Sequence, residues 1–148
     1  MYAIVYSDLI KINCAHIYRC MHGAVGETGL SKILIADDNE HNRYIARFLL
    51  EDAGHEVNQV ENGEQAVDAV IDVIYDLILM DIQMPGMDGI EATRRIKGAG
   101  VATPVVALTA KAMRGDREAI LAAGCDGYIS KPFEVDAFVS EVERYITR

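Results

Sequence analysis

The sequence predicts a doubly wound α/β domain with five parallel strands in the order 2-1-3-4-5. Short apolar runs alternate five times with longer segments in which apolar residues recur every three or four positions. This alternation is typical of right-handed strand–helix–strand units, which place helices on both faces of a parallel sheet. The central run, Leu77–Met80, is uninterrupted and ends on Asp81, which indicates a strand buried on both faces.

The first unit begins at Lys32–Ala36, a short apolar run that predicts a strand. A helix is expected from about Asn42 to Asp52, ended by Gly54. Its expected core face comprises Ile45, Phe48 and Leu49. The next apolar run, Glu56–Val60, is diluted by polar residues, so we expect it at the edge of the sheet.

The second helix begins at the Asn62–Gly63 turn. Its expected core stripe comprises Ala66, Val67, Val70, Ile71 and Ile74. After the central strand, Asp88 and Glu91 have the spacing of a capping box and mark the start of a third helix. This helix is expected to carry Ile90 and Ile96 and to stop near Gly98.

The fourth strand is predicted at Val105–Leu108 and ends on Thr109. A helix from about Ala112 to Ala122 follows it. The fifth strand, Gly127–Ser130, is short and leads directly into Lys131. The last helix has its apolar face on Val135, Phe138, Val139, Val142 and Ile146.

Residues 1–31 lie outside the repeating pattern and are predicted to form an N-terminal extension of unknown structure, whereas residues 32–148 form one domain. Two Cys-x-His steps, Cys14 to His16 and Cys20 to His22, occur in the extension. Their spacing matches none of the usual zinc patterns, so we do not predict a metal site there.

The composition narrows the classes of function. The net charge of −9 disfavours nucleic acid as a partner and suits divalent cations or basic protein surfaces. No apolar run reaches the ~20 residues that a membrane span requires, and no basic cluster marks a signal peptide. Three cysteines, an odd number, favour a reducing compartment over a disulfide framework, so we expect a cytoplasmic protein.

Five polar residues follow the predicted strands at their carboxyl ends: Asp37 and Asp38, Asp81, Thr109 and Lys131. In the order 2-1-3-4-5 the first and third strands are neighbours, so the three carboxylates meet at the switch point of the sheet. Their mutual repulsion is relieved by a hard divalent cation such as Mg²⁺, which prefers carboxylates, waters and phosphate oxygens. A carboxylate nucleophile, a metal site, a hydroxyl and a fixed ammonium are what phosphoryl transfer to an aspartate requires.

Each of these residues alone has an ordinary structural explanation, such as a helix cap, a strand-end hydroxyl or a solvated lysine. Their common position at strand ends favours the functional explanation. From Lys32 to Arg148 the chain also resembles a receiver domain of two-component response regulators. The resemblance rests on Ala36–Asn39 (ADDN), Leu79–Gly89 (LMDIQMPGMDG), Leu108–Ala110 (LTA) and Gly127–Phe133 (GYISKPF). It implies the flavodoxin-like receiver fold, with the same strand order.

The resemblance also implies the roles of the acidic residues. Asp81 is implied to be the phosphoacceptor, and Asp37 and Asp38 are implied to hold Mg²⁺ together with Asp81 and the backbone carbonyl of Gln83. A protein of this kind is a signalling phosphoacceptor that catalyses only its own phosphorylation and dephosphorylation. It is not an enzyme that turns over a separate substrate.

By the same resemblance, Thr109 and Lys131 bind the phosphoryl oxygens, and the peptide bond between Lys131 and Pro132 is cis. Thr109 and Tyr128 are implied to form a switch. Phosphorylation then shifts the population between two packings of the face made by the fourth helix, which Gly115 weakens, and by the fifth strand and fifth helix.

The implied donor is a histidine kinase or a histidine phosphotransfer protein, and the implied recipient of the signal is a downstream target protein. We expect a monomer or weak dimer with no contact to nucleic acid or membrane. No output domain is expected after the last helix. The motifs fit a single-domain regulator of the chemotaxis, cell-division or phosphorelay type and also the C-terminal receiver of a hybrid histidine kinase.

Three other classes are less consistent with the sequence. A haloacid-dehalogenase-like phosphatase needs a second aspartate two residues after the nucleophile as general acid, and Gln83 stands there. A flavin module of flavodoxin type needs a glycine- and hydroxyl-rich phosphate loop where this chain has Asp37, Asp38 and Glu40. A purely structural adaptor is expected to have lost one of the five strand-end residues, and all five are present.

Overall fold

The computed structural model describes residues 30–110 and 114–146, which alternate between strand and helix throughout. The strands are β1 (Lys32–Ala36), β2 (Glu56–Val60), β3 (Leu77–Asp81), β4 (Val105–Thr109) and β5 (Gly127–Ser130). The helices are α3 (Glu40–Asp52), α4 (Gly63–Asp72), α5 (Gly89–Gly98), α6 (Arg114–Ala122) and α7 (Val135–Ile146). None of these helices is long and apolar enough to cross a membrane.

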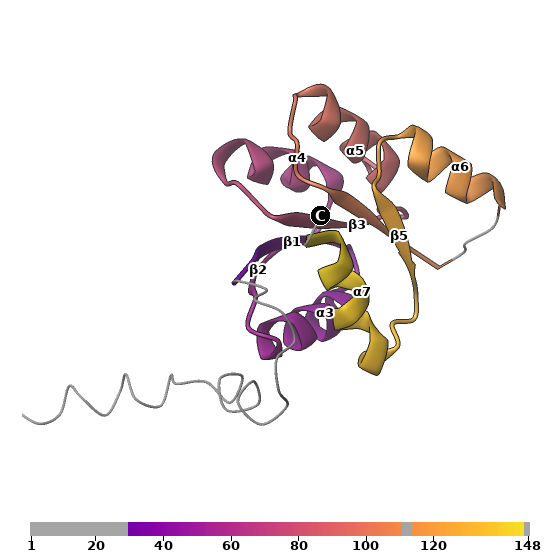
Figure 1. The fold of residues 1–148 in the computed structure, drawn as a ribbon. Coiled ribbons are helices and arrows are strands. Elements are labelled where there is room, and N and C mark those ends of the chain that lie inside the picture. Colours follow the sequence, from indigo (N-terminus) through magenta and orange to yellow (C-terminus); the bar gives the residue numbers. More distant parts are fainter. Residues whose placement is uncertain (1–29, 111–113, 147–148) are drawn as a thin grey trace, which may run out of the picture.

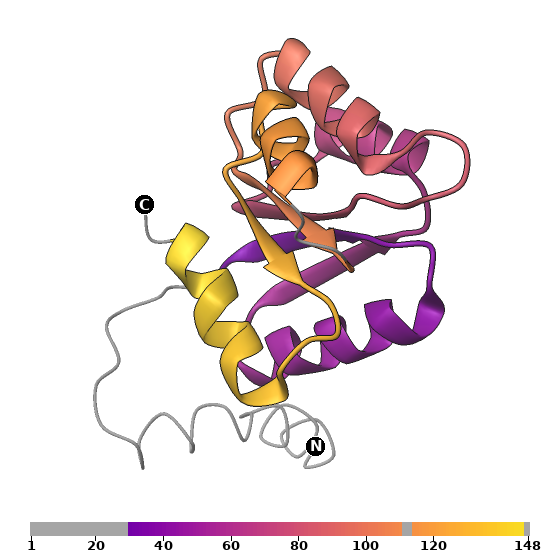
Figure 2. The same cartoon turned by 90° about the vertical axis from the view of Figure 1, so that its right-hand side faces the viewer.

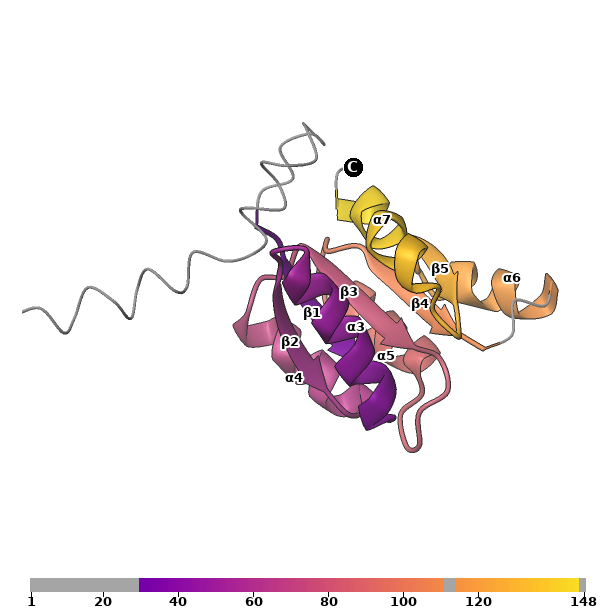
Figure 3. The ribbon, with the colours of Figure 1, turned by 90° about the horizontal axis from the view of Figure 1, so that it is seen from below.

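The strands form one parallel sheet in the order β2-β1-β3-β4-β5, which confirms the predicted topology and the edge position of β2. Helices α4, α5 and α6 cover one face of the sheet, and α3 and α7 cover the other (Figures 1 and 3). Figure 2 shows β5 at the opposite edge, between α6 and α7. Because the strands are parallel, their carboxyl ends all lie along the same side of the sheet.

The core has two layers because successive side chains of a strand point to opposite faces. The layer under α3 and α7 contains Ile33, Ile35, Leu77, Leu79, Val106 and Leu108 from the strands. The layer under α4, α5 and α6 contains Leu34, Ala36, Ile78, Met80, Val105 and Ala107. The prediction that the central strand is buried on both faces is confirmed, and this burial holds the strand ends in fixed positions.

Several predicted helix faces were wrong. Four residues expected in the core are between 58% and 90% exposed: Phe48, Ile71, Ile74 and Val135. Helix α3 instead turns Arg43, Ala46 and Leu50 toward the sheet. Ile74 follows the end of α4, and Val135 is the first residue of α7. The apolar pattern overestimated the buried face because these helices carry apolar residues on more than one side.

Other expectations fall partly or wholly outside the described residues. They include the two Cys-x-His steps, nearly all of the predicted 1–31 extension, and the predicted start of the fourth helix at Ala112. The division of the chain at Lys32 therefore stays a prediction. Helix α3 begins at Glu40, two residues before its predicted start, because the Asn39 side chain caps it.

Candidate functional site

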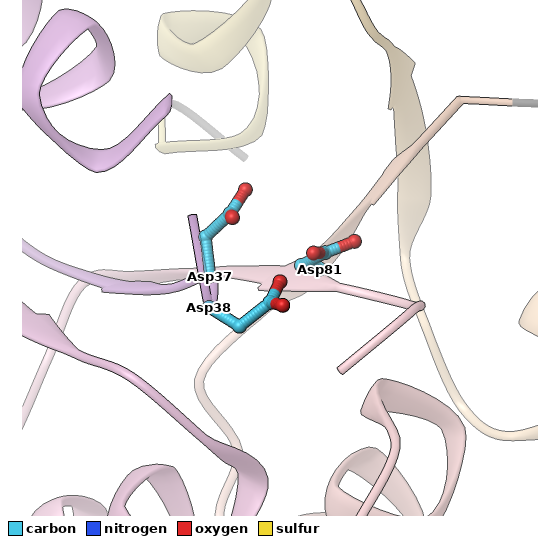
Figure 4. A group of neighbouring side chains, drawn as sticks. All are labelled: Asp37, Asp38 and Asp81. Carbon is cyan, nitrogen blue, oxygen red and sulfur yellow. The ribbon is translucent and has the colours of Figure 1, made fainter. Parts of the chain in front are cut away.

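Three carboxylates gather at the carboxyl ends of two neighbouring strands. Asp37 and Asp38 follow β1, and Asp81 is the last residue of β3 (Figure 4). One oxygen atom from each lies within 4.8 Å of the others. Asp37 and Asp81 are buried and Asp38 is exposed, so the cluster opens to solvent on the side of Asp38.

Lys131, the residue after β5, joins this cluster. Its Nζ lies 2.6 Å from Asp37 Oδ2 and 3.1 Å from Asp81 Oδ2. The lysine amide donates a hydrogen bond of 2.8 Å to the carbonyl oxygen of Thr109, which is buried at the end of β4. The Lys131–Pro132 peptide bond is cis, as the resemblance implied. The structure thus brings all five sequence-predicted strand-end residues to one edge of the sheet.

Burial and charge act in opposite directions on the central carboxylate. The pKa of Asp81 is raised to about 6, chiefly by burial and also by the neighbouring Asp37 charge, whereas the Lys131 ammonium acts to lower it. The carboxylate is therefore ionised at neutral pH, but at a cost in free energy that a bound cation would offset.

The loop after β3 folds back against Asp81. The Gln83 amide donates a hydrogen bond of 3.1 Å to Asp81 Oδ1, and the side chain of Asp88 caps α5 by accepting from the Glu91 amide at 2.8 Å. A Cβ atom at Gly89 would collide with the carbonyl oxygen of Asp81, so this position requires glycine. The requirement for glycine at this position was not predicted from the sequence, and the ligand role of the Gln83 carbonyl stays a prediction.

The loop after β1 is held from two sides. The Asn39 side chain accepts hydrogen bonds of 2.9 and 3.2 Å from two backbone amides at the start of α3. Arg43 on α3 donates from Nη1 to the carbonyl oxygen of Asp37 at 2.7 Å and from Nη2 to Glu61 Oε1 at 3.1 Å. Arg43 was not among the predicted site residues, because arginines on helices are usually exposed. Its spacing to Ala46, on the buried face of α3, is the signal that could have revealed it.

Tyr128, the predicted switch residue, lies away from the carboxylates. It is half-buried on β5 against the core layer under α4, α5 and α6, and the Arg117 guanidinium carbon lies 5.6 Å from its ring centroid. A cavity of about 480 Å³ is lined by Tyr128 and residues of α7 but by none of the three aspartates.

The donor set fits a hard cation bound through oxygen. Carboxylate oxygens are the protein ligands that Mg²⁺ prefers, and Mg²⁺ keeps several waters, which the open side at Asp38 can accommodate. The half-buried ammonium of Lys131, which contacts two of the carboxylates, can donate to an anionic group, and Thr109 ends the neighbouring strand β4.

Known proteins resemble the chain in sequence over most of its length. The family model of the response regulator receiver domain matches residues 33–143. The two-component response regulator ORR41 of rice (Oryza sativa subsp. japonica) is 50% identical over 105 residues, which cover 68% of this chain and 83% of the relative. The polar-differentiation response regulator DivK of Brucella anthropi is 41% identical over 116 residues, 77% of this chain and 94% of the relative.

Solved structures show the same fold. The receiver domain of sensor histidine kinase PA1611 from Pseudomonas aeruginosa, whose active-site cleft coordinates a magnesium ion, has a TM-score of 0.74 and 38% identity over 81% of this chain and 100% of that chain. Vibrio cholerae chemotaxis protein CheY4 has a TM-score of 0.76 and 27% identity over 79% of this chain and 99% of that chain. Full-length ShkA matches at 45% identity and a TM-score of 0.72, covering 83% of this chain and 25% of that chain.

Proposed function

The chain belongs to the receiver domain family of two-component response regulators, and from this premise we propose that Asp81 accepts a phosphoryl group from a phosphohistidine. Receiver domains are signalling phosphoacceptors that act with histidine kinases or phosphotransfer proteins and with downstream targets. The observation that carries the proposal is the position of Asp81, buried at the end of β3 with Lys131 Nζ 3.1 Å away and two further carboxylates beside it.

In the proposed reaction an oxygen of the Asp81 carboxylate attacks the phosphorus atom. A new P–O bond forms while the P–N bond to the donor imidazole breaks, and the imidazole nitrogen keeps the electron pair. The Lys131 ammonium and the Thr109 hydroxyl bind the phosphoryl oxygens and orient them for attack. The protein catalyses only its own phosphorylation and dephosphorylation, so it has no separate substrate.

Asp37, Asp38 and Asp81 would hold Mg²⁺, with the Gln83 carbonyl as a further ligand. When bound, the ion neutralises charge on the phosphoryl oxygens and on the carboxylates. Two observations support this part of the proposal: the oxygens of the three aspartates lie within 4.8 Å of one another, and the similar PA1611 receiver domain coordinates magnesium in its active-site cleft.

We propose that the signal passes to a target protein through the face formed by α6, β5 and α7. Thr109 is drawn toward the phosphoryl group, and Tyr128 turns inward to fill the space left behind. Tyr128 is half-buried against the core layer under α4, α5 and α6, on strand β5, which lies between α6 and α7 (Figure 2), and this position supports the role. We expect a monomer or weak dimer in the cytoplasm, with both the donor and the target being proteins.

Intact-mass analysis after incubation with acetyl phosphate and Mg²⁺ tests the proposal. We expect one added phosphoryl group on the wild type and none on Asp81→Asn or after chelation of Mg²⁺. Asp68→Asn, which removes an exposed carboxylate on α4, serves as the matched control and should label normally.

A wild type that gains no phosphoryl group from acetyl phosphate has two explanations: it accepts only from phosphohistidine, or the site lacks the chemistry. Beryllofluoride, which mimics the bound phosphoryl group, distinguishes between them. If the folded wild type neither gains mass nor shows a Mg²⁺-dependent spectral change with beryllofluoride, the proposed function is wrong.

A further inference from the structure

We propose that Arg43 is a positioning residue: by holding the carbonyl oxygen of Asp37, it sets the direction of Asp38 and so favours Mg²⁺ over Ca²⁺ at the acidic cluster. The inference rests on the proposed function, because it requires the cluster of Asp37, Asp38 and Asp81 to bind a divalent cation.

The contacts of Arg43 join two loops at the site. Its side chain is only 9% exposed, although it lies on a helix. Nη1 donates to the Asp37 carbonyl oxygen at 2.7 Å, in the loop after β1, and Nη2 pairs with Glu61 at 3.1 Å, in the turn after β2. A buried guanidinium is costly unless its donors are satisfied, and the planar fork of arginine can reach two acceptors that lie apart.

The contacted carbonyl controls Asp38 through the peptide bond. The carbonyl oxygen of Asp37 and the amide nitrogen of Asp38 belong to one planar peptide group, so fixing the oxygen fixes the direction in which the chain continues. The Asp37 carboxylate has its own supports, the Asn39 amide at 2.9 Å and Lys131 Nζ at 2.6 Å.

Asp38 differs in this respect. Within residues 30–110 and 114–146, no hydrogen bond or ion pair holds its carboxylate, which is exposed. Its placement near the other two carboxylates therefore depends on the backbone. Among the described contacts to the peptide group between Asp37 and Asp38, the side-chain contact is the one from Arg43.

Arg43 can affect Mg²⁺ and Ca²⁺ binding through the position of the ligands or through its charge, and the two effects predict different results. Mg²⁺ requires near-octahedral oxygen ligands at about 2.0–2.1 Å, whereas Ca²⁺ accepts six to eight oxygens at about 2.3–2.6 Å in flexible arrangements. A small displacement of Asp38 therefore weakens Mg²⁺ binding more than Ca²⁺ binding. Loss of the arginine charge alone would instead strengthen the binding of both dications alike.

The experiment compares Arg43→Lys and Arg43→Met with the same two changes at Arg47. Arg47 lies one turn further along α3, is 50% exposed and pairs with Glu51 at 3.1 Å, away from the acidic cluster. Dissociation constants for Mg²⁺ and Ca²⁺ are measured by isothermal titration calorimetry on each full-length protein, with folding checked by circular dichroism.

We expect both Arg43 variants to bind Mg²⁺ about tenfold more weakly, the usual scale for losing a residue that orients metal ligands. Ca²⁺ binding should change by no more than about twofold, so the preference for Mg²⁺ falls. The lysine variant keeps the charge but loses the fork, so its effect isolates geometry. The Arg47 variants should leave both constants unchanged.

Glu61→Ala provides a second route if an Arg43 variant does not fold. Glu61 is 68% exposed, so its removal frees one end of the fork without opening the core, and we expect a smaller fall in the same preference. An unchanged ratio of the two constants in these variants, or an equal shift of both cations, overturns the inference while leaving the proposed function intact. Failure of the wild type to bind Mg²⁺ overturns both the metal site and the inference.

Discussion

The substitution Asp81→Asn should stabilise the metal-free protein at neutral pH even though it abolishes phosphorylation. The carboxylate is buried at the end of β3, and its neighbour Asp37 carries the same charge. Ionising it in this position costs free energy that Lys131 only partly offsets. Asparagine keeps the shape and an acceptor oxygen for the Gln83 amide, but it carries no charge.

The magnitude follows from the pKa of Asp81, which burial raises from 3.8 to about 6. Because the folded-state pKa is the higher one, this carboxyl contributes its full stability below pH 3.8, and that contribution is lost as the pH rises to about 6. A gap of about two pKa units corresponds to about 3 kcal/mol. The new amide facing Lys131 reduces the gain, so we expect Asp81→Asn to be more stable by about 1–3 kcal/mol at pH 7.

Urea denaturation in EDTA, repeated between pH 4.5 and 7.5, measures this difference. The advantage of Asp81→Asn should shrink by about 2 kcal/mol between pH 7 and pH 4.5, whereas the difference between the wild type and Asp68→Asn should stay flat within about 0.5 kcal/mol. Mg²⁺ at about 100 times its dissociation constant should stabilise the wild type by about 2.7 kcal/mol and the variant far less. Equal or lower stability of Asp81→Asn at pH 7 without metal would refute the reasoning.

Three further predictions concern other parts of the molecule. Gly89→Ala should destabilise the fold by about 1–3 kcal/mol in urea, because its methyl group collides with the Asp81 carbonyl, whereas Gly98→Ala, with nothing within 4 Å, should be neutral or stabilising. Lys131→Met should bind Mg²⁺ several-fold more tightly in calorimetry, because its ammonium no longer contacts both buried carboxylates, yet accept phosphoryl groups more slowly in the mass assay. Cys125, a buried free thiol whose pKa burial raises, should react with a disulfide reagent only after denaturation, measured in a variant whose other two cysteines are serine.

The strands could be predicted from the sequence almost to the residue, but the helix faces could not. Strands β1, β2 and β5 have the predicted bounds, and β3 and β4 each extend by one residue, to Asp81 and Thr109. A strand buried on both faces is a short uninterrupted apolar run, so its ends are visible in the sequence. A helix such as α3 carries apolar residues on several sides, and packing against the sheet decides that Arg43 is buried while Phe48 is exposed.

The site, like the fold, has a part that could be predicted from the sequence and a part that could not. Residues at strand ends could be predicted to meet, because the topology of a parallel sheet brings those ends to one edge. Contacts made through the backbone leave no such pattern. The bond from Arg43 to the Asp37 carbonyl and the close approach of Gly89 to the Asp81 carbonyl depend on loop conformations that no spacing rule specifies.

Two cations contact the same aspartate, and the atom that each contacts should decide its effect. Lys131 lies 2.6 Å from a carboxylate oxygen of Asp37, which a metal ion would need, whereas Arg43 lies 2.7 Å from the carbonyl oxygen, which points the chain toward Asp38. If charge alone governed the cluster, removing either cation would strengthen Mg²⁺ binding, because both carry a positive charge that repels a dication. We expect opposite signs, with Lys131→Met strengthening and Arg43→Met weakening the binding. Removing a positive charge cannot by itself weaken the binding of a dication, so weaker binding by Arg43→Met would mean that Arg43 acts through the position of the ligands.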